Sequence, residues 1–453
     1  MANKSLFLKK TIASTCFLML GFQLNAQGQW DNVGTSANVS AAGGSWLNLA
    51  TTSSGNYYIS YYDTSVTKGS VQQFEGQSWS YLGGSAGVTN TTSLYGCMAI
   101  DNAGNIYYSN QAGAGGMEIR RFSNGAWSML PNAATSQINY QALAVSATGD
   151  LFAHHSLGSG TVKRYKNGAW EQVGNTGFAG GSTYVKMAVG TDNNIYVAQI
   201  ASGLKVYKIS VNAGSTDSWT LVGNVNAGTA YSSDNSFIDL ALDSNNVPYI
   251  SYVAASADGR KLNVKKFDGT NWVQVGAANF SDSVVNNTAV AIAGNGTVYA
   301  AASIWDSANS NHGNNQVYAL NPGATTWNKI GGTVISNGGA ATFNDLAVDS
   351  NNNLVLAYVD GTVKVKRFNT SLLAVQDAKR SDLKIYPNPA RDYIFADGKV
   401  NIVGAEIYTL SGQMIKPSFN SKSINVSQLA EGNYILKLKL SNGADYTEKI
   451  LKK

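Results

Sequence analysis

One tryptophan pattern recurs along most of this chain and restricts what it can fold into. A Trp is followed three residues later by Val, Leu or Ile in seven places, at Trp30, Trp79, Trp127, Trp170, Trp219, Trp272 and Trp327. A Gly comes next in six of the seven repeats, and Pro131 replaces it once. The tryptophans lie about 50 residues apart, a period in the range of β-propeller blades.

The segments between the tryptophans also resemble one another. Each begins with an apolar pair ending in Ala: Leu49-Ala50, Met98-Ala99, Leu143-Ala144, Met187-Ala188, Leu240-Ala241, Val290-Ala291 and Leu346-Ala347. A turn rich in Gly, Asn and Asp follows, then a second strand and a third strand that alternates with period two, as in Val363–Phe368. With the Trp segment as the fourth strand, each repeat predicts one four-stranded blade, whose small Ala suits strands that crowd toward a common axis.

The two ends of the repeat region complete each other. The last repeat ends at Phe368-Asn369 without a Trp strand, and the chain begins with an unpaired Trp strand at Trp30. Pairing these two segments would complete a seventh blade and remove the open seam of the ring. The sequence therefore predicts an all-β fold with a seven-bladed β-propeller over residues 27–369, closed by the N-terminal Trp strand.

The N-terminus has the pattern of a secretory signal peptide over residues 1–26. Lys4, Lys9 and Lys10 precede an apolar run over 12–22, and Ala26 ends a small-residue cleavage site. Removing this segment takes three of the lysines and no acids from a chain of formal charge +5, so we expect no nucleic-acid partner. No later segment is apolar enough over about 18 residues to predict a transmembrane span.

Composition is consistent with an exported all-β protein. The chain is 13% charged and contains 47 Gly and 24 Tyr, residues that are frequent in tight turns and in strands. Of its two cysteines, only Cys97 lies outside the predicted signal peptide, so no internal disulfide is expected.

A separate module is predicted over residues 383–453, after a linker at 370–382. It opens with Tyr386-Pro387-Asn388-Pro389, continues through Gly432-Asn-Tyr434, and ends in Lys452-Lys453. These motifs, in this order, resemble the type A C-terminal sorting domain of the Bacteroidetes type IX secretion system. The resemblance implies a small Ig-like β-sandwich, the secretion machinery as a partner, and a protein that is attached to the cell surface or released. An ordinary accessory β-domain is the alternative.

The propeller repeats carry a weaker resemblance. The segment Leu346–Leu354 with Val363–Phe368 is similar to NHL-type propeller repeats, and the added Trp strand resembles repeats of bacterial propeller lectins and sialidase-like proteins. The resemblance does not extend to a WD40 Gly-His/Trp-Asp pairing or to a Ser-x-Asp-x-Gly-x-x-Trp box of the sialidases.

Candidate ligand-binding residues lie next to the longer, more variable loops. One column precedes each first strand and is aromatic except at Asn287: Trp46 and Tyr95, with Tyr140, Tyr184, Phe237 and Phe343. Its rings would either stack on sugar rings or pack between blades. A second column ends each second strand, and its mixture of types predicts a surface: Tyr61, His155, Tyr252 and Tyr358, with Asn110, Gln199 and Ala302. Trp305, in the long loop 303–316, is the best single candidate.

Signals for catalysis are weak. His154 and His155 point to opposite faces of a strand, and we expect neither a metal nor a cofactor. The loop acids are scattered over different repeats, at Asp63, Asp234, Asp258, Asp282 and Asp306. The sequence favours a surface or secreted binding protein for a glycan or an adhesion ligand. The alternatives are a secreted polysaccharide-degrading enzyme, either a glycoside hydrolase or a lyase, and a structural partner of other surface proteins.

Overall fold

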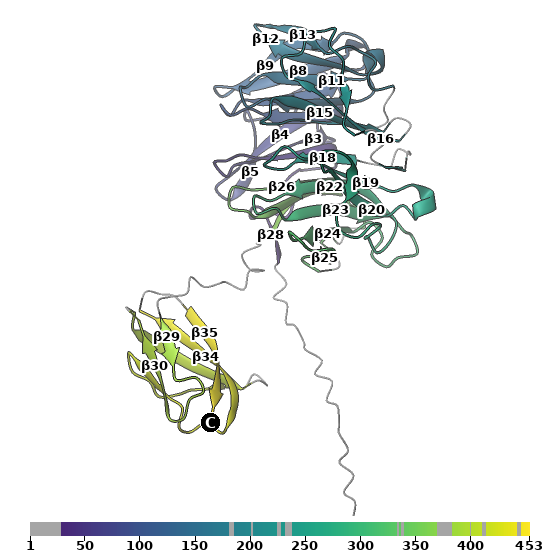
Figure 1. Ribbon diagram of the computed structural model, residues 1–453. Coiled ribbons are helices and arrows are strands. Elements are labelled where there is room, and N and C mark those ends of the chain that lie inside the picture. Colours follow the sequence, from purple (N-terminus) through teal and green to yellow (C-terminus); the bar gives the residue numbers. More distant parts are fainter. Residues whose placement is uncertain are drawn as a thin grey trace, which may run out of the picture.

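The computed structural model describes residues 29–180, 185–200, 203–223, 228–231, 238–332, 335–336, 339–368, 383–398, 400–409, 414–441 and 445–453 (Figure 1). The predicted signal peptide at 1–26 and linker at 370–382 lie outside these residues, as do Tyr184 and Phe237. In the described part of the chain, the regular structure other than strand is confined to three 3₁₀ turns, at Gly113–Gly115, Leu157–Ser159 and Ser256–Asp258. The prediction of an all-β fold is confirmed. No helix among these residues is long and apolar enough to cross a membrane.

The described residues between Trp30 and Phe368 form seven four-stranded antiparallel sheets. The first three sheets contain β2 (Gly44–Thr51), β3 (Tyr57–Asp63), β4 (Lys68–Glu75) and β5 (Ser78–Tyr81); β6 (Leu94–Ile100), β7 (Ile106–Gln111), β8 (Met117–Ser123) and β9 (Ala126–Ala134); and β10 (Gln141–Val145), β11 (Leu151–His155), β12 (Thr161–Lys166) and β13 (Ala169–Val173). The next three contain β14 (Val185–Val189), β15 (Asn194–Ile200), β16 (Leu204–Ser210) and β17 (Thr220–Leu221); β18 (Ile238–Leu242), β19 (Pro248–Val253), β20 (Leu262–Phe267) and β21 (Trp272–Gln274); and β22 (Val285–Ile292), β23 (Val298–Ile304), β24 (Asn315–Leu320) and β25 (Asn328–Lys329). The last sheet contains β26 (Thr342–Val348), β27 (Leu354–Asp360), β28 (Thr362–Phe368) and β1 (Trp30–Asn32).

The first strands of these sheets contact one another in a cycle. The contacts run from β2 to β6, β10, β14, β18, β22 and β26, and then from β26 back to β2. The last sheet in the chain contains β1, which pairs antiparallel with β28 in the register Trp30↔Phe368. This arrangement is propeller-like, with first strands around a common centre.

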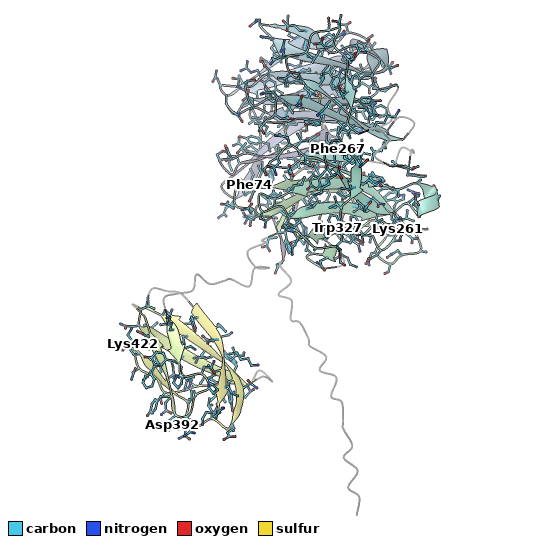
Figure 2. All side chains as sticks on the ribbon, in the orientation of Figure 1. Phe74, Lys261, Phe267, Trp327, Asp392 and Lys422 are labelled. Atoms are coloured by element: carbon cyan, nitrogen blue, oxygen red, sulfur yellow. The ribbon has the colours of Figure 1, made fainter. Side chains whose placement is uncertain are left out.

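The repeated Trp has a defined role between sheets. In six of the seven repeats its indole N–H donates a hydrogen bond to a backbone carbonyl at the end of the preceding Trp segment: Trp79 to Val33 at 2.8 Å, Trp127 to Leu82 at 2.8 Å, Trp170 to Pro131 at 2.6 Å, Trp272 to Val222 at 2.8 Å, Trp327 to Val275 at 3.0 Å and Trp30 to Ile330 at 3.4 Å. The Trp219 indole N–H has no hydrogen-bond partner among the described residues, although its ring approaches Gly174 of the preceding Trp segment in the same way. In several sheets the same ring packs on an aromatic residue of the third strand, as Trp79 does on Phe74 and Trp272 on Phe267. Figure 2 labels Phe74, Phe267 and the repeated Trp327 among the side chains of these sheets. The repeated Trp therefore couples each sheet to the one before it.

The Gly that ends the motif is explained by the same contact. Gly83 has φ +85°, and a Cβ at this position would lie 2.8 Å from the Trp127 ring. At Gly331, φ is +74°, and a Cβ would overlap the ring of Trp30. A residue without a Cβ is therefore needed both for the backbone conformation and for the approach of the next Trp.

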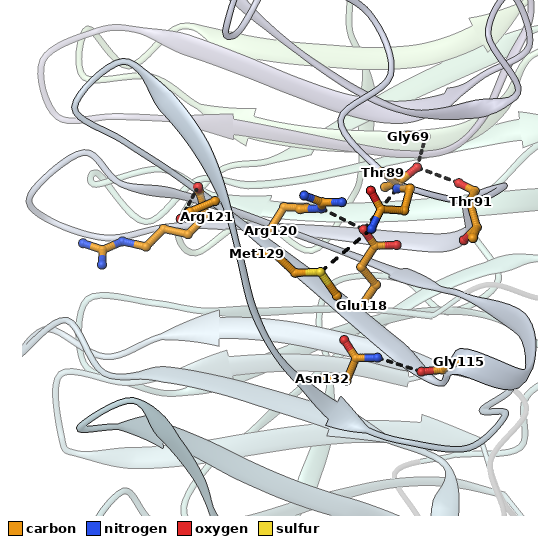
Figure 3. Close-up of polar contacts among 11 residues, drawn as sticks. Gly69, Thr89, Thr91, Gly115, Glu118, Arg120, Arg121, Met129 and Asn132 are labelled. Atoms are coloured by element: carbon orange, nitrogen blue, oxygen red, sulfur yellow. Dashed lines mark hydrogen bonds and ion pairs between the residues drawn. The ribbon is translucent and has the colours of Figure 1, made fainter.

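Polar contacts also join neighbouring sheets, as Figure 3 shows around Glu118 on β8. The Glu118 carboxylate is buried and pairs with the Arg120 guanidinium at 2.7 Å. It also accepts a hydrogen bond from the Asn90 backbone N–H at 3.1 Å. Asn90 belongs to the loop that leads from the preceding sheet, so this buried carboxylate has a structural role at the seam.

The C-terminal residues form two further sheets around their own core. One contains β29 (Lys384–Tyr386), β30 (Tyr393–Asp397) and β33 (Ser423–Asn425); the other contains β32 (Met414–Ile415), β31 (Ile402–Thr409), β34 (Gly432–Leu440) and β35 (Asp445–Lys452). Their buried residues form one cluster that includes Ile394, Ile407, Ile424 and Leu436. The two sheets therefore pack against each other as a small sandwich.

Candidate functional site

The first strands enclose a cavity of about 530 Å³ at the centre of the ring. All seven first strands, from β2 to β26, contribute to its wall, and Trp305 reaches it from the loop after β23. Ligand pockets typically have volumes of about 300–1,000 Å³. The cavity is therefore the first candidate for a functional site.

Four aromatic side chains follow one another along the wall. The ring centroids are 6.1 Å apart for Phe343 and Trp46, 5.2 Å for Trp46 and Tyr95, and 5.4 Å for Tyr95 and Tyr140. All four side chains are half-buried, and they come from β26, β2, β6 and the residue just before β10. Together with Trp305 they line the same cavity, which therefore has a continuous aromatic surface.

A backbone irregularity positions three of these rings. The strand register shifts in β2, β6 and β26 at the residues that include Trp46, Tyr95 and Phe343. Their φ angles are 47°, 52° and 53°. A bulky residue in this left-handed region is strained, and β-bulges frequently re-aim a side chain near a functional site. Asn287 on β22 shares this register shift and has φ 52°, so the bulge is a recurrent feature of the repeats, and in three of them it places an aromatic ring on the cavity wall.

Three charged residues also line the wall, on β14, β18 and β26. The Lys186 ammonium is 3.3 Å from an Asp239 carboxylate oxygen, and the Lys186 side chain is 40% exposed. Asp239 also accepts the Val290 backbone N–H at 2.9 Å. Asp345 accepts the backbone N–H groups of Leu49 at 2.7 Å and Leu346 at 2.9 Å. Water therefore reaches the Lys186–Asp239 pair and moderates it, although the wall surrounds all three groups.

The electrostatics of these groups are coupled. Burial and the nearby Asp239 carboxylate raise the pKa of Asp345 to about 6, against the attraction of Lys186. Burial disfavours the charged Lys186, but Asp239 and Asp345 outweigh it and hold the pKa of Lys186 above its usual value. The cavity therefore carries one ammonium and two carboxylates at neutral pH, a net charge of −1.

Cys97 also lines the cavity, but it is not a reactive thiol. Burial raises its pKa to about 12, although Lys186 acts in the opposite direction. The Sγ donates a hydrogen bond to the Gln141 carbonyl at 3.2 Å. Because the thiolate is the nucleophile and the metal ligand, this thiol is inert at neutral pH. No group of three or more potential metal ligands occurs among the residues that the structure describes.

The structure brings together three of the predicted ligand-binding residues, Trp46, Tyr95 and Trp305. The Trp305 ring lies 5.3 Å from that of His312, within its own loop. The predicted loop acids do not line the cavity at Asp63, Asp258, Asp282 or Asp306, and Asp234 lies outside the described residues. Asp282 instead pairs with Lys329, and Asp306 accepts a hydrogen bond from Ser283.

The expectation of a surface at the ends of the second strands is wrong. Tyr61, His155, Tyr252 and Tyr358 are at most 5% exposed, and Asn110, Gln199 and Ala302 are also buried. A second strand is flanked by a strand on each side and by the neighbouring sheets above and below it, so polar residues there are enclosed as well. Tyr358, for example, packs in a core cluster with Trp30 and Phe368.

Sequence reasoning missed the charged residues of the wall. Lys186, Asp239 and Asp345 each stand directly before the apolar-Ala pair of their repeat. The equivalent residues in the other repeats are Asn48, Cys97, Ala142 and Ala289. Aligning the repeats on this position would have shown a column that varies in charge and size, as expected for the wall of a channel.

In the C-terminal region the motifs predicted as a sorting signal meet in space. The Asn388 side chain donates to the Lys449 carbonyl at 2.9 Å and accepts the Leu451 N–H at 2.9 Å. The Lys453 backbone N–H also donates to the Ala390 carbonyl at 2.9 Å, and the Ala390 N–H donates to the Leu451 carbonyl at 2.8 Å. Asn388, between Pro387 and Pro389, is thus tied to the strand that ends in Lys452. Tyr434, two residues after Gly432, is buried, whereas Tyr386 is exposed.

Comparison with known proteins assigns the C-terminal region. Residues 384–453 match the family described as "Secretion system C-terminal sorting domain". This part of the chain is therefore a type IX sorting domain, as predicted. It indicates export to the cell surface or the medium and interaction with the type IX secretion machinery. A search of curated proteins found no match.

Solved structures support the all-β, propeller-like fold. The extracellular domain assigned to a hybrid two-component system of B. thetaiotaomicron is 15% identical, with a TM-score of 0.50 over 91% of this chain and 51% of that chain. This chain thus spans about half the length of that domain. YCF48 bound to D1 peptide is 11% identical, with a TM-score of 0.50 over 75% of this chain and 94% of that chain. At these identities the likeness concerns the fold alone.

Proposed function

We propose that the seven sheets are the blades of a single β-propeller over residues 27–369, which β1 closes. The cyclic contacts of the first strands and the pairing of β1 with β28 support this. In the same proposal, residues 1–26 are a cleaved signal peptide, 370–382 are a linker and 383–453 are the sorting domain. The type IX machinery then exports a folded propeller, so the function of the protein lies in what the propeller binds.

We infer that the propeller binds a glycan in its central cavity. The observation that carries this inference is the continuous aromatic surface of Phe343, Trp46, Tyr95 and Tyr140, with Trp305 on the same cavity. The C–H faces of pyranose rings suit flat aromatic surfaces, and the four rings are only half-buried on the cavity wall. A protein displayed at the cell surface would use such a site for adhesion or for capture of saccharides.

A glycan-array screen of the purified chain tests this proposal. We expect binding to at least one polysaccharide class, and a loss of affinity of at least about tenfold in Trp46→Ala or Trp305→Ala, because each change removes a stacking surface. Tyr393→Ala is the matched control, since Tyr393 is an exposed aromatic residue of β30, outside the cavity. A blank across glycans and whole cells would exclude the proposed function.

A polysaccharide-degrading enzyme is the second candidate, and one observation favours it. Asp239 and Asp345 share the cavity, and burial holds Asp345 partly protonated near pH 6 while Lys186 pairs with Asp239. Acid-base cleavage of a glycosidic bond usually requires two carboxyl groups, of which the general acid has a raised pKa. Product analysis of each array mixture distinguishes the two: shortened sugars that disappear in Asp345→Asn would establish the enzyme.

Export depends, in this proposal, on the contact between the two sorting motifs. Asn388→Ala removes two hydrogen bonds to β35, which we expect to destabilise the sorting domain by about 1–2 kcal/mol. The fraction of the protein that reaches the surface or the medium should fall accordingly. Asn425→Ala, which replaces an Asn of β33, is the control for an Asn substitution elsewhere in the same domain. Export of Asn388→Ala at the wild-type level would contradict a role for this contact.

A further inference from the structure

The charge of the central cavity is not balanced. Lys186 pairs with Asp239 at 3.3 Å, whereas Asp345 lies within ion-pair distance of no cation among the described residues. Two backbone N–H groups reach the Asp345 carboxylate, and a carboxylate has about four acceptor positions. The backbone therefore holds the Asp345 carboxylate in place. The carboxylate can still accept further hydrogen bonds, and no described cation pairs with it.

An aromatic pair lines the cavity at the same seam, between β26 and β2. Asp345 on β26 accepts the N–H of Leu49 on β2, and the rings of Phe343 on β26 and Trp46 on β2 are 6.1 Å apart. All of these residues line the cavity except Leu49. A carboxylate beside aromatic faces is the usual chemistry for recognition of an ammonium group, because the ring faces and the carboxylate both attract a cation.

We propose that the seam between β26 and β2 is a subsite for a protonated amine, so that the preferred ligand is a saccharide of amino sugars with free amines. This inference rests on the proposed glycan-binding function. The ammonium would bind Asp345 and lie against Trp46 and Phe343, while neighbouring sugar rings stack along Tyr95 and Tyr140. An acidic saccharide is disfavoured because Asp239 already neutralises Lys186, and a second carboxylate would meet Asp345.

The test compares two oligosaccharides that differ in their charge. A pentamer of glucosamine carries free amines, and the corresponding pentamer of N-acetylglucosamine does not. Calorimetric titration of the purified chain at pH 6.5 is expected to show about tenfold to a hundredfold tighter binding of the glucosamine pentamer, the usual range for a hydrogen bond to a charged group.

Two variants with opposite expected effects on the preference for the amine test whether the cavity causes it. Asp345→Asn should remove most of the preference for the amine, measured as the ratio of the two affinities. Lys186→Gln should increase the preference, because it leaves Asp239 without its cation. Asp282→Asn, which changes a carboxylate that pairs with Lys329 outside the cavity, is the matched control and should leave both affinities unchanged. Thermal melting of each variant shows whether it is folded.

The outcomes separate this inference from the proposed function. Equal binding of the two pentamers, or binding of neutral or acidic saccharides only, would overturn the amine subsite and leave a glycan-binding protein. A preference for the amine that persists in Asp345→Asn and does not increase in Lys186→Gln would overturn the location of the subsite. Binding of no saccharide at all would overturn the proposed function as well.

Discussion

Trp30→Ala is expected to destabilise the propeller region by about 3–5 kcal/mol, the usual cost of truncating a buried aromatic residue. Trp30 is only 9% exposed, its ring lies 5.0 Å from that of Phe368, and its indole N–H donates to the Ile330 carbonyl. These partners are about 300 residues away in the sequence. The loss would therefore weaken the seam where the two ends of the region meet.

Trp272→Ala is the matched control for this change. Trp272 is also 9% exposed and makes the equivalent hydrogen bond, to Val222, inside the ring. Calorimetric unfolding of the two variants should show losses of similar size if β1 closes the ring. A loss below about 1 kcal/mol for Trp30→Ala, beside the full loss for Trp272→Ala, would contradict closure by the N-terminal strand.

Acidification is expected to destabilise the protein through its buried histidines. Burial lowers the pKa of His154 to about 3 and that of His155 to about 4, and no hydrogen-bond partner is present for their ring nitrogens among the described residues. An unfolded His has a pKa of about 6.5. Between these values the unfolded chain binds more protons than the folded chain, so stability is full above about pH 6.5 and is lost as the pH falls toward 4.

The variant His154→Leu isolates this effect. We expect its free energy of unfolding to depend less on pH between 6.5 and 4 than that of the wild type, by about 2–4 kcal/mol. The effect is measured as the difference between wild type and His154→Leu in the pH dependence of the free energy of unfolding. Both proteins contain Asp345, whose raised pKa stabilises the folded state as the pH falls through 6. Parallel pH profiles for wild type and His154→Leu would show that His154 becomes protonated without unfolding.

The repeat pattern predicted the propeller-like region well because its spacing reflects direct contacts. Each Trp reaches the end of the preceding Trp segment, and the Gly of the motif leaves room for the next ring, as at Gly83 and Gly331. A contact that every repeat makes with its neighbour leaves the same residues at the same spacing in the sequence. The sorting motifs could also be recognised in the sequence, because Asn388 and the terminal strand contact each other within one small domain.

The site was only partly predictable. Trp46, Tyr95 and Trp305 were identified from their place next to long loops, and they do line one cavity. The column that includes Tyr61 and His155 was misplaced, because a strand pattern does not show that another sheet covers each face. The charged residues were overlooked because they occur once each, in different repeats about 50 or more residues apart.

The sequence by itself determined the all-β architecture, the coupling of the repeats and the route of export, because each depends on local motifs or on contacts that recur with a fixed spacing. Only the tertiary structure decided which residues form the site. Lys186, Asp239 and Asp345 belong to three separate sheets and share a cavity because β14, β18 and β26 face the same centre. Side chains from distant repeats converge when the ring forms, and no pattern within one repeat records that convergence.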